Sequence, residues 1–102
     1  MTRFFRTMRI KAFKSGAAFD YLRRLADYIN ATYPEVNVRV YKNILGHEYA
    51  TAYLFVDVHD YAAWEQFVSR ASNDPEYIAM RKGTEPDLVI DESVKDVMMN
   101  AV

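Results

Sequence analysis

Hydrophobic and polar residues alternate along three stretches of the chain, at 4–14, 36–44 and 49–58. In each stretch most alternate residues are apolar, which is the spacing of a β-strand with one face buried and the other exposed. The last two stretches are separated by a short loop that contains Gly46, as is typical of a β-hairpin. A fourth stretch, at 88–99, alternates less regularly and is predicted to be the last strand.

Two segments between these strands have the apolar spacing of helices. A helix is predicted over 17–32, where an aliphatic residue recurs every three or four positions. A second helix is predicted over 61–72, with Asp60 as its N-cap and Trp64 on its buried stripe. The segment SNDP interrupts this helix, and a short further helix is predicted to end at Gly83.

The predicted order of elements is therefore β-α-β-β-α-β, in one domain that spans 1–102. Two right-handed β-α-β crossings around a hairpin produce a ferredoxin-like α+β sandwich. In this fold a four-stranded antiparallel sheet carries its helices on one face only.

The two faces of the predicted sheet differ in composition. One face is continuously aliphatic, and we expect it to lie under the helices: Met8, Ile10, Ala12, Val36, Val38, Val40, Ala52, Leu54 and Val56. The other face places aromatic residues among charged ones: Phe5, Phe13, Tyr41, Tyr53 and Phe55, with Arg9, Lys11, Arg39 and Asp57. Because no predicted helix remains to cover this second face, we expect a homodimer in which two such faces pack together.

Composition narrows the classes of function. The 102 residues carry a net charge of −1 with both signs mixed along the chain, which does not indicate a nucleic-acid-binding protein. The chain has no cysteine, so it has no disulfide and no cysteine nucleophile, and this is compatible with a cytoplasmic location. The first residues carry arginines within their apolar part, so we expect no signal peptide. No apolar run approaches about 18 residues, so we expect no transmembrane helix.

The whole chain resembles the dimeric α+β barrel superfamily, and the NIPSNAP-like and antibiotic-biosynthesis-monooxygenase-like groups within it. The resemblance rests on the element order, on YLFVDVHDYAAWEQF at 53–67, where a strand runs into a helix, and on the helix break SNDPEYIAM at 72–80. It implies a barrel dimer that binds a small molecule. An activity inferred from it is inferred by fold analogy.

Two features depart from well-known branches of that superfamily. Stress-responsive barrels carry a histidine on the first strand, whereas TMRIKAFK at 7–14 has none. Haem-degrading members need a histidine on the second helix, whereas 61–83 has none. Haem oxygenation is therefore not expected.

The chain has two histidines. His47 lies in the predicted hairpin loop, where an exposed side chain is the ordinary outcome. His59 precedes the Asp60 cap, so it either packs against Trp64 at the helix start or lines a pocket as an acid or base. With no clear third ligand nearby, a metal site is not expected.

The remaining candidates are aromatic or cationic. Trp64 is predicted to be either a core residue or the wall of a ligand pocket, and Tyr77 is predicted to line that pocket. Tyr41 and Tyr53 are predicted to be either dimer contacts or phenol donors to a ligand carbonyl. Arg39 is predicted either to pair with Asp57 or to bind a substrate carboxylate.

Our leading hypothesis is a small-molecule-binding protein. It could be a cofactor-independent enzyme of the monooxygenase, cyclase or isomerase type that acts on a hydrophobic substrate. The chain has no glycine-rich phosphate loop, so no nucleotide cofactor is expected. The alternative is a non-catalytic dimeric interaction module whose aromatic sheet face is only an interface. A cavity with converging polar groups would favour the first hypothesis.

Overall fold

The computed structural model describes residues 1–46 and 49–102, so the prediction for His47 lies outside the described residues. The described elements follow in the order β1 (Thr2–Arg9), α1 (Ser15–Thr32), β2 (Val36–Lys42), β3 (Thr51–Val58), α2 (Tyr61–Ala71), α3 (Pro75–Leu88), the 3-10 helix η1 (Asp91–Ser93) and β4 (Lys95–Asn100). This order confirms the predicted β-α-β-β-α-β arrangement, with the second helix divided into α2 and α3.

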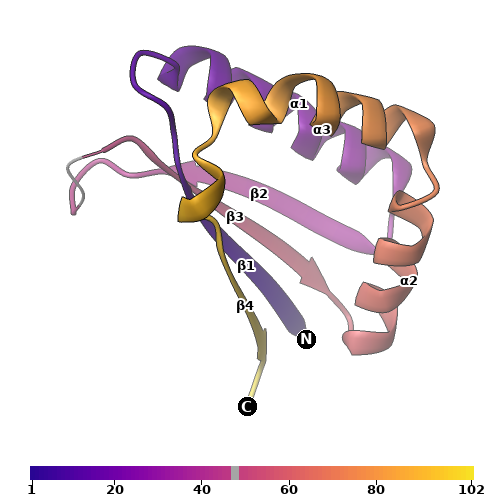
Figure 1. Ribbon diagram of the computed structural model, residues 1–102. Coiled ribbons are helices and arrows are strands. Elements are labelled where there is room, and N and C mark those ends of the chain that lie inside the picture. The colour runs from indigo at the N-terminus through magenta and orange to yellow at the C-terminus, as the bar shows by residue number, and fades with distance from the viewer. Residues whose placement is uncertain (47–48) are drawn as a thin grey trace.

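The four strands form one antiparallel sheet in the order β2-β3-β1-β4. Figure 1 shows α1 and α3 on the same face of this sheet, with α2 at the end where β3 finishes. The sheet's other face has no helix over it. The predicted ferredoxin-like α+β fold is therefore confirmed.

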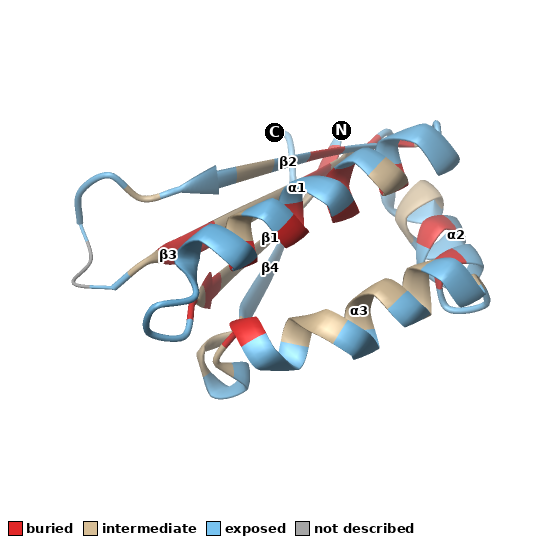
Figure 2. Ribbon diagram, turned by 90° about the horizontal axis from the view of Figure 1, so that it is seen from above, coloured by how far each residue is buried: buried red, intermediate tan, exposed pale blue. Residues whose placement is uncertain are grey.

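The core lies between the sheet and α1. Leu22, Leu25 and Ile29 of α1 are almost fully buried, as their helical spacing predicts. Val38 and Val56 meet them from the sheet. In Figure 2 the buried residues of α1 form a stripe, whereas most of α3 is half-buried or exposed. The helix layer is therefore looser over α3 than over α1.

Two aspartates set the starts of α2 and α3. The Asp60 carboxylate accepts a hydrogen bond of 2.9 Å from the Ala63 backbone N–H, which confirms the predicted cap. The Asp74 carboxylate accepts from the backbone N–H of Glu76 and also from the hydroxyls of Tyr28 and Tyr33. Asp74 thus links the start of α3 to Tyr28 of α1 and to Tyr33, the residue just after α1.

The predicted end of α3 is wrong. The helix continues past Gly83 and through Pro86 to Leu88, so the segment TEPD at 84–87 is helical rather than a loop. Gly46 is the glycine with a positive φ in the described chain, and Gly83 does not have the left-handed conformation that ends many helices. Pro86 has no backbone N–H, so the hydrogen bond that this position would donate to the carbonyl four residues earlier is missing from the last turn of α3.

The first and last strands are shorter than predicted. β1 ends at Arg9, and Phe13 has a φ of 64° and a fully exposed side chain, so it does not belong to the aromatic sheet face. β4 starts only at Lys95, because η1 occupies the residues before it. A single bridge between Ile10 and Val89 is all that continues the pairing there.

Candidate functional site

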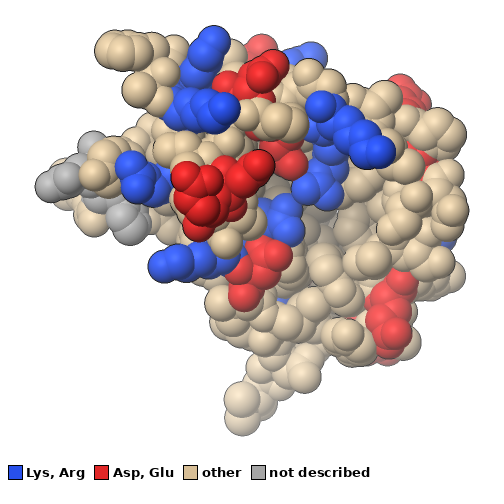
Figure 3. All heavy atoms as spheres, viewed as in Figure 1, with Lys and Arg blue, Asp and Glu red and all other residues tan. Residues whose placement is uncertain are grey.

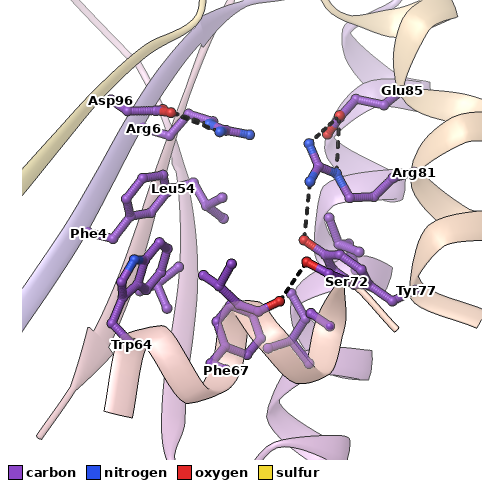
Figure 4. Close-up of a pocket in the computed structure, with 15 residues that line it drawn as sticks. Phe4, Arg6, Leu54, Trp64, Phe67, Ser72, Tyr77, Arg81, Glu85 and Asp96 are labelled. Atoms are coloured by element: carbon purple, nitrogen blue, oxygen red, sulfur yellow. Dashed lines mark hydrogen bonds and ion pairs between the residues drawn. The ribbon is translucent and has the colours of Figure 1, made fainter. Parts of the chain in front are cut away.

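A cavity of about 300 Å³ lies between the sheet and the three helices. Figure 4 shows that its wall combines β1, β3 and β4 side chains with side chains of α2 and α3. This volume is at the lower end of the range of small-molecule pockets in proteins. The cavity is the kind of space that the small-molecule hypothesis requires.

One end of the cavity is aromatic. The Phe4 ring stacks on the Trp64 indole with centroids 4.6 Å apart, and Phe67 lies 5.8 Å beyond Trp64. Leu54 and Val56 of β3 complete this end. A flat apolar molecule would find aromatic faces and aliphatic groups here, and few polar atoms.

The opposite end carries polar groups from α3. The Arg81 guanidinium donates to one Glu85 carboxylate oxygen at 3.0 and 3.3 Å, and also to the Tyr77 hydroxyl at 3.3 Å. The Tyr21 hydroxyl of α1 donates to the other Glu85 oxygen at 3.3 Å. Because the Tyr77 oxygen accepts from Arg81, its own proton can be donated to a ligand.

A second ion pair faces this group from the sheet. The Arg6 guanidinium donates to both oxygens of Asp96 at 2.7 and 2.9 Å. Figure 4 shows Arg6 and Arg81 pointing toward each other across the cavity. The side chains of Arg6, Asp96 and Arg81 are 22%, 42% and 35% exposed, so this end opens to solvent.

Burial and neighbouring charges shift the pKa values of Arg81 on α3 and of Tyr21 on α1. Burial lowers the pKa of Arg81, but the interactions with Tyr77 and Glu85 outweigh it, so its pKa lies above the ordinary value. Burial, and then the negative charge of Glu85, raise the pKa of Tyr21. Around neutral pH Arg81 is therefore a guanidinium at the cavity, and the Tyr21 hydroxyl beside Glu85 keeps its proton.

Local sequence and register place these polar residues. Tyr77, Arg81 and Glu85 are four residues apart, so they lie on one face of α3. Arg6 and Asp96 are direct partners in the β1–β4 ladder and point to the helix side of the sheet, like Phe4. The Asp74-Pro75 break directs α3 back over the sheet and so brings both pairs to one cavity.

The structure divides the predicted ligand-binding residues between two places. Trp64 and Tyr77 line the cavity. Arg39, Tyr41 and Tyr53 lie on the opposite face of the sheet, where with Arg3 and Phe55 they line a separate hollow of about 430 Å³. The five residues therefore do not line one pocket, because the odd-numbered residues of β2 and β3 point away from the helices. Their roles in ligand binding stay predictions.

His59 follows β3 with an exposed side chain and is not among the residues that line the cavity. Its catalytic role remains a prediction. Sequence reasoning missed Arg6, Arg81, Glu85 and Asp96. The four-residue spacing of Tyr77, Arg81 and Glu85 indicates that these side chains share one helix face. Because the sequence pattern predicts that the helix ends at Gly83, it does not place Glu85 on that face.

The open sheet face carries a ladder of aromatic rings. Phe5 stacks on Phe55 with centroids 4.8 Å apart, and Tyr41 meets Phe55 edge-on at 5.5 Å. Beside them, Asp57 binds Arg3 at 2.6 Å and Arg39 at 2.9 Å, which includes the predicted Arg39–Asp57 pair. Hydrogen bonds from Arg3, reinforced by Arg39, hold the pKa of Asp57 below its usual value although burial opposes them.

Within residues 1–46 and 49–102, no cluster of three or more histidine, aspartate or glutamate side chains suited to a metal ion occurs. No helix among the same residues combines the length and hydrophobicity needed to cross a membrane. Figure 3 shows positive and negative side chains interspersed on the face it presents, rather than a patch of one sign.

No protein-family model matches the chain, and no curated protein is significantly similar in sequence. Solved structures are nevertheless similar over nearly all of it. An uncharacterised NIPSNAP domain protein from Burkholderia xenovorans has a TM-score of 0.81 at 19% identity, over 100% of this chain and 95% of that one. A dimeric protein of unknown function and ferredoxin-like fold from Bacteroides fragilis has a TM-score of 0.73 at 11% identity, over 98% and 95% of the two chains.

The cofactor-independent oxygenase SnoaB from Streptomyces nogalater, in a mutant form, is also similar. Its TM-score is 0.70 at 12% identity, over 98% of this chain and 91% of that one. At such identities the similarity establishes architecture and not activity. The chain therefore has the ferredoxin-like fold that NIPSNAP domain proteins and cofactor-independent oxygenases share, as the resemblance in its sequence indicated.

Proposed function

We propose that this protein binds a small, largely hydrophobic molecule in the cavity between its sheet and its helices. The observation that carries the proposal is that the cavity has an apolar end and a polar end. Phe4 stacks on Trp64 at the apolar end, and the Arg81 guanidinium lies at the polar end. A flat ligand with an oxygen at one edge fits both ends. Its rings would lie against Trp64, and its oxygen would accept hydrogen bonds from Tyr77 and Arg81.

This arrangement supports an enzyme that acts beside a ligand carbonyl without a nucleotide cofactor. Donors held at the Tyr77 and Arg81 positions would stabilise negative charge that develops on a ligand carbonyl oxygen. The similar fold of a protein described as a cofactor-independent oxygenase supports this reading by analogy. The proposed reaction class is therefore oxygenation, cyclisation or isomerisation of a hydrophobic carbonyl compound.

We also propose that the protein is a homodimer through the open sheet face. Phe5, Phe55 and Tyr41 form the aromatic ladder there, and Val97 and Met99 of β4 add apolar side chains that are 49% and 41% exposed. An apolar patch of this kind on a sheet marks an interface. A similar protein from Bacteroides fragilis is described as dimeric, which supports the same assembly here.

The chain provides its own probe for the binding test, because Trp64 is its one tryptophan. Titration with aromatic carbonyl compounds, such as 1,4-naphthoquinone and anthrone, should quench Trp64 fluorescence in a saturable way. Arg81→Gln should weaken binding about tenfold, which is the loss expected for one hydrogen bond to a charged group. Lys82→Gln removes the same charge from an exposed neighbouring position and should leave binding unchanged. Equal effects of the two substitutions would overturn the proposal.

One observation favours the non-catalytic alternative. Both arginines at the cavity already have carboxylate partners, Asp96 for Arg6 and Glu85 for Arg81. A charged substrate would therefore have to compete with these carboxylates. If no carbonyl compound quenches Trp64 while light scattering still gives a dimer, the interaction module is the better description.

A further inference from the structure

The end of β1 is built into a second polar site, on the side of the sheet away from the cavity. The Arg9 backbone N–H donates to the Ser93 hydroxyl oxygen at 2.8 Å, and the Arg9 carbonyl accepts from the Ile90 N–H at 3.0 Å. Ser93 in turn donates to the Ile90 carbonyl. The turn that contains η1 therefore holds the backbone of Arg9 from both directions, beyond the point where β1 and β4 pair.

The Arg9 side chain has an unusual environment for an arginine of this protein. Its guanidinium lies over the Tyr49 ring, 3.6 Å from the centroid. Its Nε is shielded from solvent and has no hydrogen-bond partner among residues 1–46 and 49–102. Arg3 and Arg6, its neighbours on β1, each bind an aspartate through two hydrogen bonds.

A shielded N–H donor without an acceptor is costly, because it has lost its water and gained nothing in return. Stacking on Tyr49 stabilises the positive charge from the flat side of the guanidinium but does not satisfy the N–H groups along its edge. Nε itself has no solvent-exposed surface, so an incoming oxyanion would accept from the terminal nitrogens of the guanidinium, which share the same delocalised charge.

The surroundings of Arg9 leave room for such a ligand. A hollow of about 470 Å³ is lined by Arg9 and Tyr49, by Glu92 of η1 and by Lys95 of β4. Arg9 and Lys95 are positive and Glu92 is negative, so the lining has a net charge of +1. Ile90 and the Tyr49 ring add apolar surface beside the charges.

We propose that this hollow is a binding site for a small organic carboxylate. The carboxylate accepts from the terminal guanidinium nitrogens of Arg9, Lys95 adds a second positive charge, and the organic part lies against Tyr49 and Ile90. The site is separate from the cavity that holds Trp64, because Arg9 and Arg6 have opposite parity along β1 and point to opposite faces of the sheet. The proposal therefore stands whether or not the cavity binds a carbonyl compound, and it requires that the proposed dimer leave this end of the open sheet face uncovered.

Benzoate and benzamide provide a matched pair of probes, since they have nearly the same shape and only benzoate is charged. In two-dimensional amide NMR at constant ionic strength, benzoate should shift the signals of Arg9, Thr51 and Ser93 with saturation, and benzamide should not. Equal shifts with both compounds would overturn the proposal.

Variants make the test specific. Arg9→Gln should weaken benzoate binding tenfold or more, whereas Arg24→Gln, on the exposed side of α1, should have no effect. Arg9→Lys keeps the positive charge but lacks the planar guanidinium, so it should bind benzoate with intermediate affinity. It also serves as a control if the glutamine variant does not fold. Glu92→Gln removes the one negative charge of the lining and should tighten binding. If Arg9→Gln and Arg24→Gln bind benzoate equally, Arg9 is not the anchor and the site is rejected.

One further outcome is decisive. If Arg9→Gln leaves benzoate binding unchanged but alters the monomer–dimer equilibrium, then Arg9 binds a carboxylate of a second copy, and a free-ligand site is excluded.

Discussion

The Phe4 ring of β1 lies stacked on the Trp64 indole of α2, with centroids 4.6 Å apart and planes inclined by 21°. This contact joins the first strand to the second helix and forms the aromatic wall of the cavity. The cavity and the stability of the fold therefore depend on the same pair of rings.

Phe4→Ala should lower the free energy of unfolding by about 2 kcal/mol. Truncating a fully buried phenylalanine to alanine costs roughly 3–5 kcal/mol. The loss is smaller here because Phe4 is only partly buried. Trp64 emission should shift to longer wavelength as the indole loses its cover. Phe13→Ala is the matched control and should change neither quantity, because Phe13 is fully exposed. Urea denaturation followed by fluorescence gives both results.

The Arg6–Asp96 pair should be weakly but measurably coupled. Its two hydrogen bonds and the partial burial of Arg6 favour the pair, and solvent screening limits it, so a double-mutant cycle should give about 0.5–1 kcal/mol. The Asp20–Arg23 pair on α1 is 56% and 72% exposed and should give a smaller coupling. A coupling of zero for Arg6–Asp96 would mean that register alone, and not the ion pair, holds these side chains at the cavity.

Acid should selectively remove the contribution of Asp57. The folded-state pKa of Asp57 is depressed by its hydrogen bonds to Arg3, so its stabilising effect is fully present above the unfolded-state pKa of about 3.9 and is lost as pH falls toward the folded-state value. Asp57→Asn should therefore be less stable than the parent protein at pH 6, and the gap should narrow below about pH 4. A gap that stays constant from pH 6 to pH 2 would contradict the assigned shift. Chemical denaturation at each pH measures it.

A charge in the aromatic ladder should prevent the proposed dimer. The parent protein should scatter light as a particle of twice the 11.9 kDa chain mass. Phe55→Glu places a carboxylate between Phe5 and Tyr41 on the open sheet face and should yield monomers. Tyr61→Glu, at an exposed position of α2, should remain dimeric. A monomeric parent protein at micromolar concentration would refute the assembly.

Tyr77→Phe and His59→Ala distinguish the two candidate proton donors. Tyr77 faces the cavity and His59 does not line it, so Tyr77→Phe should weaken quenching of Trp64 by a carbonyl ligand while His59→Ala leaves it unchanged. The loss for Tyr77→Phe should be roughly 1 kcal/mol, which is the size of one neutral hydrogen bond. A binding defect in His59→Ala would instead place the histidine at the ligand.

Local pattern was enough to predict most of the architecture. Period-two alternation sets strand faces directly, because successive side chains of a strand point to opposite sides, and it separated Val38 and Val56 from Tyr41 and Phe55. Asp60 and the Asp74-Pro75 break likewise act on backbone groups within one turn, and the structure confirms both.

The polar end of the cavity depended on contacts between distant parts of the chain. Arg6 meets Asp96 only because β1 and β4 pair in one register, 90 residues apart in sequence. Arg81 reaches the same cavity because α3 continues past Gly83 and lies over the sheet. The sequence by itself determined which face of the sheet the residues within the strands occupy, since that follows from local geometry, although Ala12 and Phe13 lie exposed beyond the end of β1. Which charged side chains meet, and around what space, was decided only by the tertiary packing of α3 and β4 against β1, because pairing partners and helix ends depend on the neighbours that each segment finds.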